Sequence, residues 1–214
     1  MIKSLFETKI YMVHYPDLDE LNRLTNEFVV DLPFSKKIND VIWRRPGCPD
    51  GIDTTTMHWF VNDPNHPPEF LHKNPAFKNV VDFISMHAKI YWEELKYKPN
   101  LEPVLANSWV QRYRGGSHEL GVHNHPAMVP IVGSLYLNSS PGQGNLVLEH
   151  PLDMMLSQVS YMTGGRNERL YDIDVTTGLL LLWPGWLKHS VMPNTTEKTR
   201  YTWAMEFYAN EKQT

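Results

Sequence analysis

The chain has 214 residues, a length that fits one domain with a substantial hydrophobic core. Hydrophobic residues make up 42% of it and charged residues 21%, which are ordinary globular values and exclude wholesale disorder. A net charge of −4 argues against a nucleic-acid partner, because neutralising phosphates requires a concentrated basic face. The single cysteine cannot form an internal disulfide, and no apolar run reaches membrane-spanning length, so we expect a cytoplasmic protein without a membrane partner.

The first half of the chain carries the helical patterns. Apolar residues recur every three or four positions from Asp17 to Val29, and Asp17 or Asp19 can cap the helix that this pattern predicts. A second helix is predicted from Asn74, whose side chain can cap it, to Leu95. The stretch between the two is rich in Pro, Gly and Asp and predicts irregular loops.

From residue 107 onward the apolar period changes to two, which is typical of β-strands. Strand-like segments separated by turn residues are 109–113, 133–137, 145–149, 178–183 and 200–208. In the last of them one face is apolar, and the other carries Arg200, Thr202, Ala204 and Glu206.

Short strands without helical patterns between them predict an antiparallel fold. We expect a mainly β chain with an α flank: a double-stranded β-helix (jelly-roll or cupin-like) core, with the N-terminal helices packed on one sheet. The predicted organisation is a single domain, 1–214, with a helical and loop-rich region over 1–103 and the β-helix core over 104–214.

Three of the ten histidines stand where a metal site can form. His123 and His125 are two residues apart, and on a strand such residues point to the same side and can offer lone pairs to one ion. Pro126 then ends the strand. His189 follows an apolar strand and a Pro-Gly turn, which return it toward the barrel mouth. Each histidine taken singly is more often a surface or hydrogen-bonded residue, but their order together favours a metal site.

The segment from Asn107 to Asn210 resembles the 2-oxoglutarate/Fe(II)-dependent oxygenases. It is most similar to a small branch related to prolyl hydroxylases, on the basis of the opening SLFETKIY and the motifs H-N-H-P, S-L-Y-L and W-P-G-W-L-K-H. The resemblance implies a double-stranded β-helix core, one ferrous ion, 2-oxoglutarate as co-substrate and O₂. Carried over by position, it makes His123, His125 and His189 the iron ligands.

The same resemblance implies a 2-oxoglutarate site. Arg200 takes the position of the arginine that binds the far carboxylate of the co-substrate, since guanidinium is a permanently charged, two-pronged donor. Thr202 resembles the small hydroxyl residue two positions later. Tyr136 is similar to a strand residue that hydrogen-bonds the same carboxylate.

One position departs from the superfamily pattern. Most members have H-x-D or H-x-E, so that two histidines and one carboxylate bind the iron. Here His125 replaces the carboxylate, which leaves three neutral ligands. Sequences of the small branch share H-x-H, which favours a working variant; the alternative is that Glu119 or Glu149 supplies an anionic ligand.

The resemblance therefore implies an enzyme, a dioxygenase that releases succinate and CO₂ while hydroxylating a peptide side chain (with proline as one candidate), an amino acid or a small molecule. Two alternatives stay open. One is a non-catalytic, cupin-like protein in which the histidines hold a structural or sensory metal, and the other is a three-histidine Fe(II) dioxygenase that does not use 2-oxoglutarate. Arg200 and Thr202 discriminate, because a structural metal site needs no carboxylate anchor.

Overall fold

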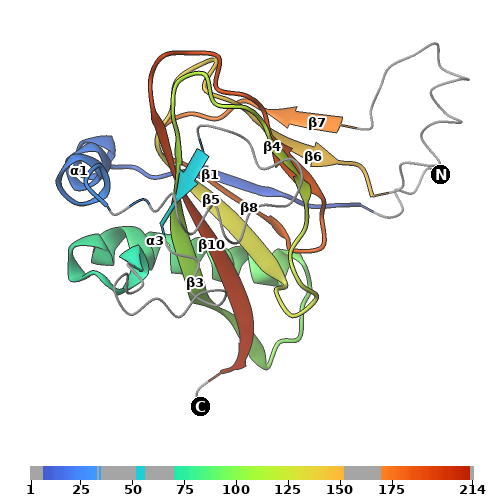
Figure 1. Cartoon of the computed structure of the whole chain (residues 1–214). Coiled ribbons are helices and arrows are strands. Elements are labelled where there is room, and N and C mark those ends of the chain that lie inside the picture. The colour runs from blue at the N-terminus through green and yellow to red at the C-terminus, as the bar shows by residue number, and fades with distance from the viewer. Residues whose placement is uncertain (1–6, 33, 35–51, 56–69, 152–169, 213–214) are drawn as a thin grey trace, which may run out of the picture.

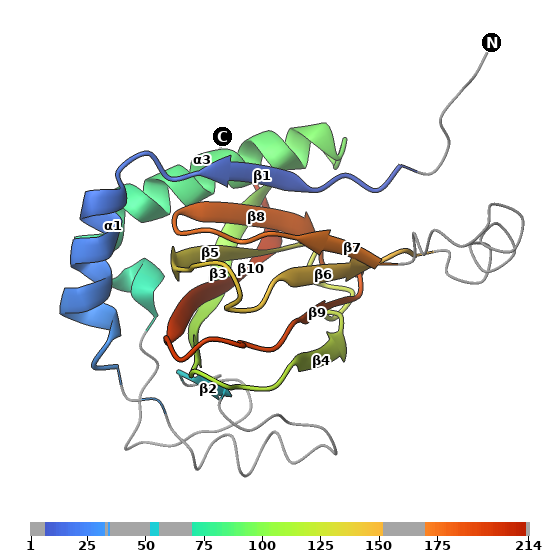
Figure 2. The same cartoon turned by 90° about the horizontal axis from the view of Figure 1, so that it is seen from above.

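The computed structural model describes residues 7–32, 34, 52–55, 70–151 and 170–212. Two antiparallel β-sheets lie face to face, and helices cover the outer side of the larger one (Figure 1). Figure 2 shows helices α1 and α3 together on this side, away from the smaller sheet. The architecture confirms the prediction of a mainly β chain with helices packed on one sheet.

The larger sheet has six strands in the order β1-β8-β5-β10-β3-β2, and the smaller has four in the order β4-β9-β6-β7. Every strand pair is antiparallel. The strands of the larger sheet are β1 (Tyr11–His14), β2 (Ile52–Thr54), β3 (Leu101–Tyr113), β5 (Ile131–Asn138), β8 (Leu179–Pro184) and β10 (Arg200–Glu211). Those of the smaller sheet are β4 (Leu120–His123), β6 (Leu146–Glu149), β7 (Leu170–Ile173) and β9 (His189–Val191).

Both predicted helices are present. Helix α1 (Leu18–Leu24) continues into a π-helical turn, η1 (Thr25–Val29), and Asp17 is its cap, accepting a hydrogen bond from the backbone N of Glu20 at 2.8 Å. Helix α3 spans Lys78–Glu94.

The start of the second predicted helix is a 3₁₀ turn, η3 (Pro75–Phe77), which follows another 3₁₀ turn, η2 (Leu71–Lys73). Asn74 caps η3 through its side chain, which accepts from the backbone N of Ala76 at 3.0 Å. Within the part of the chain that the structure describes, no helix is both long and apolar enough to cross a membrane.

The alternation along β10 separates core from site. Its apolar face packs under the helices, where the ring of Trp203 meets that of Phe77 edge-on at 5.5 Å. Its polar face, with Arg200, Thr202 and Glu206, points into the space between the two sheets, and all three side chains are buried.

Candidate metal centre

Two of the predicted histidines lie opposite each other in the smaller sheet. His123 ends β4 and His189 begins β9, they form a register pair, and their ring centroids are 4.2 Å apart. His125 lies two residues beyond the end of β4, so the prediction of one strand through both H-x-H histidines is wrong at its last residues. The backbone N of His125 instead donates to the carbonyl of Gly185 at 2.9 Å, which fixes it beside the Pro-Gly turn.

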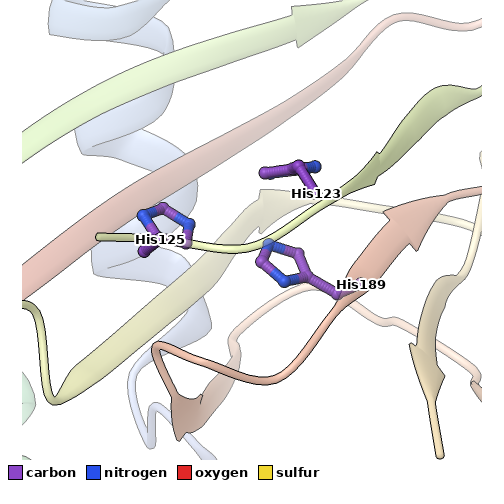
Figure 3. Close-up of side chains that lie close together, drawn as sticks. All are labelled: His123, His125 and His189. Atoms are coloured by element: carbon purple, nitrogen blue, oxygen red, sulfur yellow. The ribbon is translucent and has the colours of Figure 1, made fainter. Parts of the chain in front are cut away.

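The three imidazoles gather around one point (Figure 3). One ring nitrogen from each lies within 4.8 Å of the other two, a spacing that suits ligands of a single metal ion. Within the described ranges this is the group with metal-ligand spacing, and it contains no carboxylate. Neither Glu119 nor Glu149 belongs to it or lines the pocket around it.

Each Nδ1 has a hydrogen-bond acceptor beside it. These acceptors are the carbonyl of Gly121 for His123 (2.9 Å), a carboxylate oxygen of Glu206 for His125 (2.6 Å) and the carbonyl of Leu187 for His189 (2.9 Å). Since carbonyls and carboxylates only accept, each Nδ1 carries a hydrogen, and in the neutral form of each ring the lone pair of Nε2 is free to bind a metal. A partner at the second nitrogen is how proteins orient metal-binding histidines.

Two groups lie near Nδ1 of His189. The indole Nε1 of Trp183 also lies 3.3 Å from its Nδ1, but two N–H groups cannot bond to each other. The contact with the carbonyl of Leu187 is the shorter, at 2.9 Å, and it sets the tautomer.

Burial keeps the ligands in the form that binds metal. Desolvation lowers the pKa of His123, and the nearby His125 lowers it further, against the opposing effect of the bond to Gly121. Desolvation also lowers the pKa of His189 well below its ordinary value, and His123 adds to the effect. Both imidazoles are therefore neutral at physiological pH, as metal binding requires.

A pocket between the sheets connects the histidines to the polar face of β10. Its empty volume is about 430 Å³, including its open mouth. It is lined by all six residues predicted to form the metal and co-substrate sites: His123, His125, His189, Arg200, Thr202 and Tyr136.

Arg200 is a buried cation without a described anion. Its side chain is 1% exposed, and none of the ion pairs within the described ranges includes it. The guanidinium lies over the ring of Tyr113, 4.1 Å from the centroid, and donates from Nη1 to the carbonyl of Gly144. Its Nε is buried with no hydrogen-bond partner, and so is Oγ1 of Thr202. Two orphaned polar groups facing one pocket fit the carboxylate of a bound ligand.

Among the residues in or next to the pocket that had no predicted role, four stand close to predicted site residues. Trp109, Gln111 and Tyr113 share one face of β3 because they alternate along it, and register pairs them with the polar face of β10. The alternation was visible in the sequence, but the pairing was not. The fourth is Glu206, next to the pocket rather than on its wall, which holds His125.

Solved structures share this fold. HygX from Streptomyces hygroscopicus, solved with nickel and 2-oxoglutarate bound, is 14% identical, with 94% of this chain and 83% of HygX covered and a TM-score of 0.57. An oxidoreductase of the 2OG-Fe(II) oxygenase family from Burkholderia pseudomallei is 10% identical, with 93% and 84% covered and a TM-score of 0.58. A prolyl-4-hydroxylase from Pseudomonas putida is 14% identical, with 94% and 92% covered and a TM-score of 0.54. No curated protein matches the sequence.

A family model described as "Putative 2OG-Fe(II) oxygenase" matches residues 107–206, which carry every predicted site residue. By this family model, residues 107–206 belong to the 2-oxoglutarate/Fe(II)-dependent oxygenase superfamily, and the solved structures share the fold. The predicted double-stranded β-helix core is thereby confirmed. Oxygenases of this superfamily depend on Fe(II), 2-oxoglutarate and O₂. The pocket fits these requirements, since it combines three imidazoles at metal-ligand spacing with a buried guanidinium that lacks a described anion.

Proposed function

We propose that this chain is an oxygenase that binds Fe(II) through Nε2 of His123, His125 and His189 and uses 2-oxoglutarate as co-substrate. The observation that carries the proposal is the buried guanidinium of Arg200, in the same pocket as the three histidines and without a described acidic partner. A metal site alone needs no such cation. A dicarboxylate that reaches from the metal to Arg200 uses both.

The chain's own groups position the co-substrate. Arg200 presents its unpartnered Nε to the remote carboxylate, and a hydrogen bond to a charged group is worth about 1.5–3 kcal/mol. The hydroxyl of Thr202 is the second free donor, and Tyr136, which lies on β5 opposite Thr202, is the third group we assign to this carboxylate. When bound, the iron and 2-oxoglutarate together supply the activation of O₂.

The substrate class is also a proposal, and the solved structures of similar fold support it. We propose hydroxylation of a peptide side chain, with proline as one candidate, of an amino acid or of a small molecule, with release of succinate and CO₂. The support is that one structural relative is a prolyl-4-hydroxylase, while HygX has been solved with hygromycin B bound. We also propose that the protein is cytoplasmic, on the ground that its single cysteine cannot form an internal disulfide.

A second candidate is a three-histidine Fe(II) dioxygenase that does not use 2-oxoglutarate. The absence of a carboxylate from the cluster of described residues favours it, and the buried Arg200 counts against it. The third candidate is a non-catalytic metal-binding protein, which likewise does not explain why the guanidinium of Arg200 is buried.

Succinate formation tests the proposal. The protein is loaded anaerobically with Fe(II), mixed with 2-oxoglutarate and exposed to O₂, with and without prolyl peptides, amino acids and small-molecule candidates. We expect succinate above the level of metal-free protein, with a further rise in the presence of the right substrate class. A metal-loaded protein that neither binds 2-oxoglutarate nor forms succinate would refute the oxygenase and leave one of the other two readings.

A further inference from the structure

A buried carboxylate stands behind one of the three histidines. Glu206 is 0% exposed, and its Oε1 lies 2.6 Å from Nδ1 of His125, 81 residues away in the sequence. Its Oε2 accepts from Nδ2 of Asn107 at 3.1 Å. The register of β10 against β3 shifts between Glu206 and Phe207, and such irregularities re-aim side chains next to sites.

Within the described ranges, no permanently charged side chain balances Glu206. It hydrogen-bonds to an amide and an imidazole, and none of the ion pairs among the described residues joins it to a lysine or arginine. A carboxylate enclosed without a cation is costly, because burial removes its hydration. Since Nδ1 of His125 faces Glu206, the opposite nitrogen of the same ring faces the point where the three histidines meet. A metal ion there would be the missing positive charge.

We infer that Glu206 supplies the anion of the metal site through His125, as a positioning residue in place of a metal-bound carboxylate. This rests on the metal site of the proposed function. The two positive charges of Fe(II) and the one of Arg200 then match the two negative charges of 2-oxoglutarate and the one of Glu206. A site with the common H-x-D ligand set has the same balance, with its carboxylate on the metal.

Glu206 also makes the three ligands unequal. His123 and His189 donate to neutral carbonyls, of Gly121 and Leu187, whereas His125 donates to a carboxylate. A carboxylate partner fixes the tautomer and ring orientation and raises the basicity of the nitrogen that binds the metal. His125 is therefore the strongest donor of the set, at the position where most relatives have an acid.

Glu206→Gln removes the charge and keeps the size. We expect Co(II) and Fe(II) to bind roughly 10- to 100-fold more weakly, the usual effect of losing such a partner. The Co(II) absorption spectrum should shift as the ligand field of His125 weakens. The metal-free variant should unfold at the same or a higher temperature than wild type, since an unbalanced buried charge has gone. A merely structural role predicts the reverse, a lower unfolding temperature with little change in the Co(II) spectrum.

Glu149→Gln is the matched control, because Glu149 lies on β6 of the smaller sheet and outside the pocket. It removes the same charge and should leave metal affinity and spectrum as in wild type. Loss of metal in Glu149→Gln, with none in Glu206→Gln, would overturn the inference and make Glu149 the anion.

His125→Asp tests the exchange of roles between the two positions. Added to Glu206→Gln, it puts one anion back, and metal affinity should recover to within about threefold of wild type, which is about 0.7 kcal/mol. Made alone, it places a new carboxylate beside Glu206, and like charges at such a distance repel. The double variant should therefore bind metal more tightly than either single one. If the losses of metal-binding free energy in the two single variants simply add up in the double variant, the inference is overturned.

The metal titrations are made without 2-oxoglutarate or O₂, and the binding of 2-oxoglutarate to the metal-loaded wild type is measured separately. If wild type binds metal but not 2-oxoglutarate, the proposed function fails and the role of Glu206 stands. If wild type binds both and Glu206→Gln is indistinguishable from it, the role of Glu206 fails and the proposed function stands. A wild type that binds no metal would overturn both.

Discussion

Arg200 offers the sharpest prediction, because its surroundings set the size of the effect. Nη1 is already engaged by the carbonyl of Gly144, whereas Nε is buried without a partner. At least one charge-assisted bond to a carboxylate is thus available, worth about 1.5–3 kcal/mol. Since about 1.4 kcal/mol is a factor of ten, Arg200→Ala should weaken 2-oxoglutarate binding roughly 10- to 150-fold. The affinity for metal should be almost unchanged, because Arg200 is not among the proposed ligands.

Anaerobic titration measures this directly. 2-Oxoglutarate is added to the Fe(II) protein, and the visible charge-transfer band expected of a chelated keto acid is followed to saturation. Arg200→Lys should recover only part of the loss, since an ammonium lacks the planar two-pronged geometry and the stacking on Tyr113. Arg114→Ala is the matched control: Arg114 pairs with Asp53 and does not line the pocket, so its loss should leave the titration unchanged.

Two results would refute this reasoning. The first is a wild type that binds Fe(II) and gives no band with 2-oxoglutarate. The second is equal affinity in wild type and a folded Arg200→Ala variant, with Co(II) binding and circular dichroism showing that the site and fold are intact. Either result would remove the co-substrate from the pocket and favour the alternatives without it.

Three further predictions concern the ligands, the core and pH. His189→Ala should abolish stoichiometric Fe(II) binding while the far-UV circular dichroism is retained; iron at wild-type affinity would show that His189 is no ligand. Phe77→Ala should lower the free energy of unfolding by about 3–5 kcal/mol in denaturant titrations, because Phe77 is fully buried against Trp203; a loss below about 1 kcal/mol would contradict this packing. Burial, aided by the charge of Lys73, lowers the pKa of His72 to about 4, so between pH 6.5 and 4 the unfolded chain takes up a proton that the folded chain does not, and stability falls as the pH falls. His72→Asn should lose less stability than wild type between pH 7.5 and 4.5, as measured by thermal unfolding; equal losses would exclude His72 as the source.

Local patterns in the sequence were enough for the elements and for part of the site. Helix α1 begins after Asp17 because a short acceptor side chain can satisfy a free backbone N–H, and the sequence shows such a residue directly. The two faces of β10 follow from alternation, which puts Arg200 and Thr202 on the face opposite the apolar one; the structure shows that this face is buried as well. The histidine motifs likewise carried enough information to name three residues that the fold does bring together.

Tertiary structure decided what lies opposite these residues. Alternation tells which residues share a face of a strand but not which strand pairs with it. The register that sets Tyr113 beside Arg200 joins residues that are 87 positions apart in the chain. Register shifts occur at Tyr201/Thr202, at Glu206/Phe207 and between Leu120 and His123, all next to site residues. Each depends on how two strands fit together, and no single segment encodes it.

The contact between Glu206 and His125 shows the physical reason most clearly. In the sequence Glu206 is one acid among 24 Asp and Glu residues, and H-x-H looks like a metal site that lacks its anion. Strand β10 carries the carboxylate into the interior, and the loop after β4 turns the imidazole toward it. Whether a buried charge is balanced depends on distances of a few ångströms between segments far apart in the chain, and those distances exist only once the sheets have paired.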